Sequence, residues 1–226
     1  MGALCVRLFQ PLLLSLIAFF NAEQGIFSLF HLPYWSQFLL GIIALDALIY
    51  WQHRVFHRVP LLWRLHQVHH SDQALDVSSA VRFHPIEILL SLGIKAIAIL
   101  CLGIPIEAVL VFDILLNACA MFNHTNVRLP QYAESIIKRF LVTPDMHRIH
   151  HSVRFKETNS NYGFCLSLWD RLFHSYTEQA QGGDEQIRIG LPRSQSTNKA
   201  SLKNLLLMPF TSPPPSTRDV THSKKP

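Results

Sequence analysis

Eight of the chain's 13 histidines fall into three short clusters whose spacing suits metal binding. The first cluster has the pattern H-x-x-x-H, and the second and third both have the pattern H-x-x-H-H. Residues three or four positions apart share a face of an α-helix, so each cluster is expected to present two or three imidazoles on one helical stripe. So many imidazoles would repel one another if protonated and would be buried without partners if neutral, whereas a bound metal satisfies their lone pairs. The eight residues are His53, His57, His66, His69, His70, His147, His150 and His151.

The number of histidines indicates two metal ions rather than one. A structural zinc takes four protein ligands and a catalytic zinc takes three, so eight imidazoles exceed the needs of one ion. Imidazole also binds iron, copper and nickel. Motifs for zinc proteases, serine hydrolases, covalent haem and phosphate loops are absent from the sequence. A nitrogen-rich pair of irons beside membrane helices would suit the oxidation of a lipid C–H bond by O2.

The segments that must carry these histidines are strongly apolar. The 226-residue chain is 49% hydrophobic and only 15% charged, against about 25% charged in an average soluble domain. Spanning helices need about 20 mostly apolar residues. Four apolar stretches come close to this length. The first is short, and a signal peptide is the alternative interpretation. The second reaches the required length if its helix continues through Gln52, and the third and fourth are expected to form a helical hairpin. The four stretches are about residues 8–20, 38–51, 86–102 and 106–122.

Positive charge indicates the orientation of these segments. Residues 52–85 contain four arginines and residues 123–226 contain 14 of the 20 basic residues, whereas residues 21–36 and 103–105 contain none. Basic residues favour the cytoplasmic side, so the histidine clusters and the N-terminus are expected there. We predict an all-α integral membrane bundle of about four helices in two hairpins, capped by a cytoplasmic histidine-rich helical domain. A soluble helical protein with buried helices is the alternative.

Two charged residues lie within the expected hairpin. Lys95 and Asp113 are each nine positions from Ile104, the centre of the turn, and therefore sit at the same depth. Either charge alone would cost about 2.5–3.5 kcal/mol at mid-membrane. We predict that the two side chains form an ion pair; the alternative is a snorkelling lysine and an aspartate that faces a water-filled pocket.

The histidine clusters and five further motifs resemble the fatty-acid hydroxylase/sterol desaturase superfamily, particularly its bacterial members, over about residues 38–210. This resemblance implies a di-iron centre on the cytoplasmic side of a membrane bundle with a lipid tunnel. It also implies O2-dependent hydroxylation or desaturation of a lipid or sterol-like substrate. Electrons would come from a separate donor, such as a reductase, a ferredoxin or a cytochrome b5-like protein. The further motifs are Arg82-Phe83-His84-Pro85-Ile86-Glu87, Asn123-His124-Thr125-Asn126, Thr143-Pro144-Asp145-Met146-His147, Asn161-Tyr162-Gly163 and Leu168-Trp169-Asp170-Arg171-Leu172-Phe173.

The resemblance also implies ten metal ligands, because His84 and His124 join the eight clustered histidines. His84 precedes Pro85 and could instead merely cap a helix. His174, where many relatives have a glycine, is not expected to be a ligand, and neither are His31 and His222. Ligating imidazoles need partners for their other ring nitrogen. The candidates, each of which could instead be a cap or a surface charge, are Asp72, Glu87, Asp145, Asn161 and Asp170.

We expect four regions in the chain. Residues 1–37 form a membrane segment and an external turn, residues 38–176 the catalytic domain, residues 177–210 a loop with an interfacial segment, and residues 211–226 a disordered tail. The expected function is that of a membrane-bound oxidoreductase that uses O2, two iron ions and external electrons. A non-redox metal-binding membrane protein and a zinc-dependent membrane hydrolase are the alternatives. Basic residues are scattered without a reading helix, so no nucleic-acid partner is expected.

Overall fold

The structure is a computed structural model that describes residues 2–21, 24–192 and 201–211. Helices dominate these residues, which contain no β-strand beyond two isolated bridges that pair Leu141 with Leu166 and Ser152 with Ile189. The predicted all-α class is therefore confirmed.

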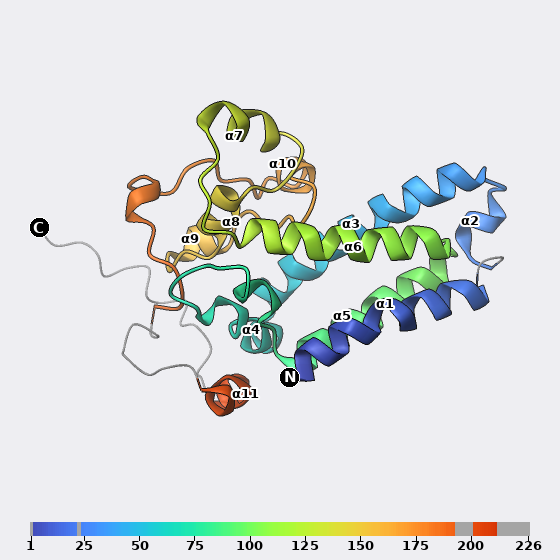
Figure 1. Cartoon of the computed structure of the whole chain (residues 1–226), viewed down its shortest axis with the longest axis horizontal. Coiled ribbons are helices and arrows are strands. Elements are labelled where there is room, and N and C mark those ends of the chain that lie inside the picture. The colour runs from blue at the N-terminus through green and yellow to red at the C-terminus, as the bar shows by residue number, and fades with distance from the viewer. Residues whose placement is uncertain (1, 22–23, 193–200, 212–226) are drawn as a thin grey trace, which may run out of the picture.

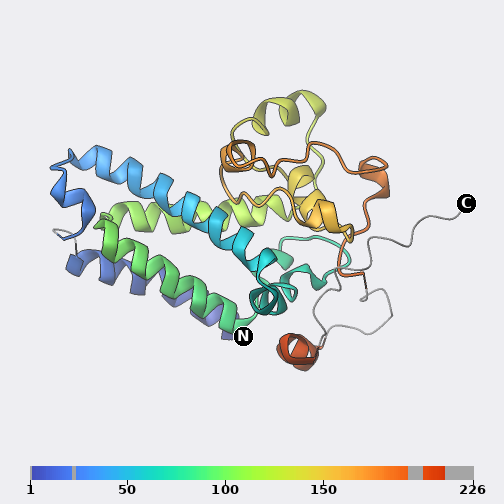
Figure 2. The same cartoon turned by 180° about the vertical axis from the view of Figure 1, so that it is seen from behind.

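Four long helices run alongside one another and form the bundle seen in Figures 1 and 2. Four candidate spans are long and apolar enough to cross a membrane, as the sequence predicts, and the protein is an integral membrane protein. Three of them coincide with the second, third and fourth long helices, and the first runs from Phe9 in the first long helix to Leu29. The second long helix continues well past Gln52, and so it carries the first histidine cluster out of the apolar region. The helices are α1 (Gly2–Asn21), α3 (Tyr34–Arg58), α5 (Pro85–Leu102) and α6 (Ile106–Asn123).

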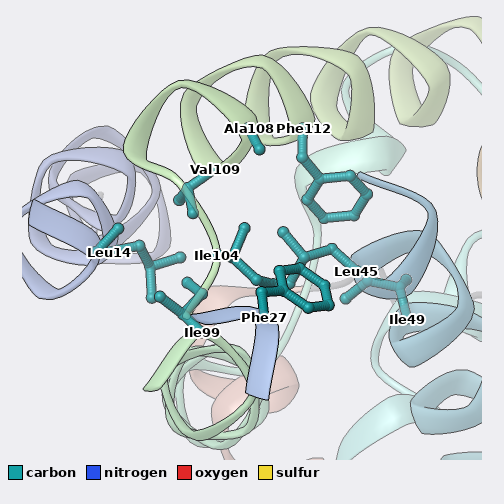
Figure 3. Close-up of a cluster of buried hydrophobic side chains, with 10 residues drawn as sticks. Leu14, Phe27, Leu45, Ile49, Ile99, Ile104, Ala108, Val109 and Phe112 are labelled. Atoms are coloured by element: carbon teal, nitrogen blue, oxygen red, sulfur yellow. The ribbon is translucent and has the colours of Figure 1, made fainter. Parts of the chain in front are cut away.

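The centre of the bundle is filled by apolar side chains from each long helix. Figure 3 shows Leu14 of α1, Leu45 of α3, Ile99 of α5 and Phe112 of α6 pointing toward one another. Many other apolar side chains on the same helices are exposed, among them Phe19 at 62%. This pattern fits helices whose outer faces contact lipid rather than water.

The bundle end away from the histidine clusters is closed by two turns in backbone contact. One turn precedes α2 (Ile26–Leu29), and the other joins α5 to α6. Gly103 has a φ of 70°, and a Cβ atom built there would lie 2.1 Å from the carbonyl oxygen of Gln24. Only glycine fits both this conformation and this contact. The Asn21 side chain adds a hydrogen bond of 2.9 Å to the carbonyl of Leu100.

The opposite end of the bundle carries the short helices, which wrap the ends of α3 and α6 (Figure 1). α11 contacts α4 and coincides with the expected interfacial segment. Of the predicted disordered tail, residues 212–226 lie outside the described residues. The short elements are α4 (Pro60–His66), η1 (His69–Ser71), η2 (Ser79–Val81), α7 (Gln131–Ile137), α8 (Pro144–His150), α9 (Phe155–Thr158), α10 (Leu168–Leu172), η3 (Asp184–Gln186) and α11 (Leu202–Thr211).

The predicted ion pair inside the hairpin is confirmed. Lys95 Nζ of α5 lies 2.8 Å from Asp113 Oδ1 of α6, and each residue is only 1% exposed. The pair joins two neighbouring spanning helices at the same depth, and each charge compensates the other within the bundle.

Removing one partner of this pair should cost more than removing both. Asp113→Asn leaves the Lys95 ammonium buried without a counter-charge, which should destabilise the protein by about 3–5 kcal/mol. The double variant Asp113→Asn/Lys95→Met should recover part of that loss, measured as the unfolding temperature in detergent. An unfolding temperature for Asp113→Asn that is no lower than that of the double variant would contradict a stabilising pair.

Candidate metal centre

Nine histidines converge into two adjacent groups at the end of the bundle that carries the short helices. Within each group, one potential ligand atom per residue lies within 4.8 Å of every other. Group one contains residues of α3, α4, η1 and α8. Group two contains residues of η1 and α8 together with the residues that directly follow α6 and α8. Group one is His53, His57, His66, His70 and His150, and group two is His69, His124, His147 and His151.

The expectation that each H-x-x-H-H motif turns three imidazoles to one face is wrong. His147 and His151 belong to group two, whereas His150 between them belongs to group one. The helical turn explains this division, because residues four apart differ by about 40° around the axis whereas adjacent residues differ by about 100°. Each motif therefore contributes to both groups. The second motif divides in the same way, with His66 and His70 in group one and His69 in group two.

Local sequence explains how these motifs are placed. α8 begins with Thr143 as its N-cap, which accepts from the backbone N–H of Met146, and with Pro144 at the first helical position. α4 also begins on a proline, Pro60. α4 ends at His66, but the next two residues keep right-handed helical angles up to η1. The second motif therefore keeps its helical spacing across a break between two elements.

The ring nitrogens of both groups are buried and closely spaced. Eight of the nine residues are at most 4% exposed, and both ring nitrogens of the ninth, His57, are inaccessible. In group one, Nε2 of His53 and Nε2 of His66 are 3.1 Å apart. In group two, the Nε2 atom of His147 lies 3.3 Å from that of His124 and 3.1 Å from that of His151. Two nitrogens bound to one ion at about 2.1 Å are separated by about 3.0–3.4 Å at right or tetrahedral angles.

Several of these nitrogens have no partner within the part of the chain that the structure describes. Both ring nitrogens of His57 and His70 lack a hydrogen bond, as do Nε2 of His150 and Nδ1 of His147 and His151. A buried polar nitrogen without a partner is costly. A cation in group one would take one nitrogen from each of His57, His70 and His150, and a cation in group two would take the clustered Nε2 atoms, so the donor set fits two metal ions with nitrogen ligands.

Hydrogen bonds at the other ring nitrogen fix the tautomer of five histidines. Four of them donate from Nδ1 to a backbone carbonyl, which can only accept, and so Nε2 keeps its lone pair for the group. The fifth, His66, has Nδ1 2.6 Å from the carboxylate of Glu87. The four carbonyl contacts are His53 to Tyr162 at 2.7 Å, His69 to Arg82 at 3.3 Å, His124 to Ala120 at 2.8 Å and His150 to Ser160 at 2.7 Å.

The electrostatic environment keeps these rings neutral. Burial, reinforced by repulsion from neighbouring histidines, holds the pKa values of His69, His70, His147 and His151 well below the ordinary value. Burial also lowers the pKa of His150 to about 3. Neutral imidazoles are the form that binds metal.

The loop that follows the third motif is held by two of the predicted partner residues. Asp170 accepts from the backbone N–H groups of Tyr162 and Gly163 at 2.8 and 2.7 Å, and so fixes the peptide whose carbonyl accepts from His53. Asn161 has a φ of 51°, which asparagine tolerates better than most residues, and its side chain bonds the backbone of Met146 and Thr177. These two residues act through the backbone and do not contact a ring.

The remaining predicted partners and the tenth predicted ligand lie elsewhere. Asp72 pairs with Arg82, and Asp145 pairs with Arg148 at 2.7 Å. His84 belongs to neither group, because it caps α5: its Nδ1 accepts from the N–H of Ile86, and its Nε2 faces the carbonyl of Leu206. His31 and His174 also lie outside the groups, whereas His222 lies outside the described residues.

Sequence reasoning missed two features that support the site. Asp46 of α3 accepts from the indole N–H of Trp169 at 2.7 Å, and thus ties α10 to the bundle. The four carbonyl acceptors belong to residues whose side-chain type carries no signal. Asp46 could have been singled out because it is a charged residue within an apolar stretch. Backbone carbonyls, by contrast, are present at every residue, so the sequence does not indicate which of them accept these bonds.

The number of metal ions bound per chain should fall when a grouped histidine is removed and should not fall when another histidine is removed. His150→Ala removes a group-one nitrogen and should lower bound metal from about two ions per chain to about one or fewer, measured by elemental mass spectrometry. His174→Ala is the matched control and should retain the full content. Equal metal content in the two variants would contradict the assignment of His150 to a metal-binding group.

The loop should depend on Asp170 much more than on Asp145. Asp170→Ala leaves two buried N–H groups without an acceptor, and it should destabilise the protein by about 3 kcal/mol or more. Asp145→Ala breaks only a partly exposed pair and should cost about 1 kcal/mol or less. Thermal unfolding in detergent distinguishes the two variants, and similar losses in both would contradict the role given to Asp170.

Comparisons with known proteins agree with this geometry. The relatives found include ornithine lipid hydroxylase OlsE of Rhizobium tropici, 31% identical over 157 residues, or 70% of this chain and 46% of the relative. Alkylglycerol monooxygenase of Homo sapiens is 29% identical over 76% of this chain and 37% of the relative. The chain thus spans less than half the length of these two relatives. No solved structure matches the chain significantly.

The family match covers most of the region built around the histidines. A family model described as Fatty acid hydroxylase matches residues 38–175, which run from α3 through α10 and include all nine grouped histidines. The chain therefore belongs to the fatty acid hydroxylase family.

Proposed function

We propose that this protein is an O2-dependent membrane oxidoreductase that hydroxylates a lipid with the help of two iron ions. The observation that carries the proposal is the pair of buried, all-nitrogen histidine groups at one end of a membrane bundle. Membership of the fatty acid hydroxylase family supports the reaction class, and the relatives' names, hydroxylase and monooxygenase, favour hydroxylation over desaturation.

The nine grouped histidines are the proposed ligands. Group one would hold one ion with five nitrogens, and group two would hold the other with four. His84 is left out of this set, because its two ring nitrogens are engaged with Ile86 and Leu206. When bound, iron would supply the activation of O2 that attack on a lipid C–H bond requires.

The protein's own residues orient the ligands and exclude water. Glu87 and four backbone carbonyls fix the rings, as metal-site partners commonly do. Aromatic side chains cover the groups: Phe83 stacks on His69 with ring centroids 4.1 Å apart, and Trp63 lies 4.8 Å from His57. A dry, apolar surround of this kind protects a reactive centre from side reactions.

Iron is favoured over zinc by the activity named for the relatives, because a hydroxylase or monooxygenase needs a redox-active metal. Imidazole nitrogens suit either metal, and Glu87, which hydrogen-bonds His66, places a carboxylate beside group one. A redox-inert metal site with no turnover would agree with the geometry but not with the activity named for the relatives.

The reaction needs electrons and a defined side of the membrane. Hydroxylation consumes one O2, two electrons and two protons, and it yields one alcohol and one water. We propose a separate donor, such as a reductase, a ferredoxin or a cytochrome b5-like protein. The basic residues of segments 52–85 and 123–226 support a cytoplasmic position for the histidine groups.

The proposal predicts oxygen-dependent lipid products that require both groups. Cells that express the chain in air should accumulate a lipid heavier by one oxygen atom, found by comparative lipidomics, and the same cells under nitrogen should not. His69→Ala and His150→Ala should each abolish the product while membrane insertion stays intact, because each removes a ligand from a different group. His174→Ala is the control and should retain activity.

Three outcomes would count against the proposal. Substantial product from His69→Ala or His150→Ala would contradict the ligand assignment. Product formation that continues without oxygen would favour a hydrolase. Purified chain that holds zinc and no iron, with no O2 uptake, would favour a non-redox metal protein.

A further inference from the structure

A cavity of about 80 Å³ lies inside the membrane bundle beneath the histidine groups. Its lining includes the rings of His53 and His66 in group one, and it extends along α5 to Lys95. Three polar lining residues on α5, namely Glu87, Ser91 and Lys95, are four positions apart and therefore advance about 6 Å each. The cavity therefore links group one to the depth of the buried ion pair.

The lining of this cavity combines apolar side chains, among them Ile49, Phe56 and Phe164, with polar side chains that a hydrocarbon chain alone would not need. Each of the four spanning helices contributes a side chain that can form hydrogen bonds: Gln10 from α1, Gln52 from α3, Ser91 from α5 and Asn117 from α6. Polar residues within spanning segments are costly and mark functional positions. Asn117 already donates to the carbonyl of Asp113 at 2.8 Å, so binding of a polar group depends on the lining atoms that remain without a partner.

Two acceptor atoms of the lining have no donor among the residues that the structure describes. The Gln52 amide donates to Ser91 Oγ at 3.0 Å, but its oxygen is buried without a partner. Glu87 uses Oε1 for His66, and its Oε2 is likewise buried without a partner. An alkyl chain would leave both oxygens unsatisfied, at a cost of about 1–3 kcal/mol each.

We infer that this cavity binds a hydroxyl group of the substrate, with Gln52 and Ser91 as its specificity-determining residues. A hydroxyl both donates and accepts, so it satisfies the Gln52 amide in either orientation. Gln52 and His53, a member of group one, line the same cavity, so the substrate is a lipid whose hydroxyl lies near the carbon to be oxidised. That the bound lipid is a substrate rests on the proposed function, whereas binding of a hydroxyl in this cavity does not.

Binding of two matched probes tests the inference without turnover. Tritiated 1-hexadecanol and tritiated hexadecane differ only in the hydroxyl, and their binding to the purified, iron-loaded full chain can be measured by scintillation proximity under nitrogen. The wild type should prefer the alcohol. Gln52→Met keeps the size of the side chain but removes its hydrogen bonds, and it should reduce that preference roughly fivefold to tenfold. Ser91→Ala should act in the same direction.

Gln37→Met is the matched control, because it makes the same change on α3 at a residue outside the cavity lining. It should leave the preference unchanged. Comparing the ratio of the two dissociation constants between variants cancels the different partitioning of the probes into the bilayer. Equal affinity of the wild type for both probes would mean that water alone occupies the polar lining, and it would overturn the inference. A preference that survives in both Gln52→Met and Ser91→Ala would also overturn it.

The result is separable from the proposed function. A chain that prefers the alcohol in this way but forms no oxygenated lipid in air contradicts the proposed function and supports the binding site. A chain that oxygenates lipids but does not distinguish the two probes contradicts this inference alone.

Discussion

Neutral imidazoles crowded into a buried space constrain the rest of this structure. Nine rings turn their nitrogens toward two common points, and several of those nitrogens have no other partner among the described residues. Burial keeps the rings outside the membrane segments uncharged, so they present lone pairs rather than protons. Without a shared cation, such an arrangement would lose the hydrogen bonds that every ring makes in water. The arrangement is therefore one that metal binding and folding stabilise together.

The membrane bundle and the histidine groups depend on one another through continuous helices. α3 is a spanning helix whose last two turns carry His53 and His57, and α6 is a spanning helix that ends immediately before His124. α5 starts beside group one at Glu87 and reaches the buried ion pair two turns later. The histidine groups are thus fixed relative to the spanning helices, and the cavity beside group one lies within the bundle that these helices form.

Much of this organisation could be predicted from the sequence, because its signals are local. Unbroken apolar stretches predict spanning helices, and equal distances from Ile104 predict the Lys95–Asp113 pair. The histidine spacing indicated metal binding but not the grouping of the rings, because each H-x-x-H-H motif contributes to two groups and a pattern alone does not report how many points its residues face. His84 lies outside both groups, and a histidine before a proline suits a helix cap as well as a ligand.

X-ray absorption at the iron edge of the purified, correctly inserted chain tests whether the two histidine groups hold iron. We expect about two irons per chain, each with an inner shell of imidazole nitrogens and no sulfur. His84→Ala should leave this shell unchanged, because that ring belongs to neither group. A chain that holds no iron after iron supplementation, or iron whose inner shell is dominated by sulfur, would rule out the proposed site.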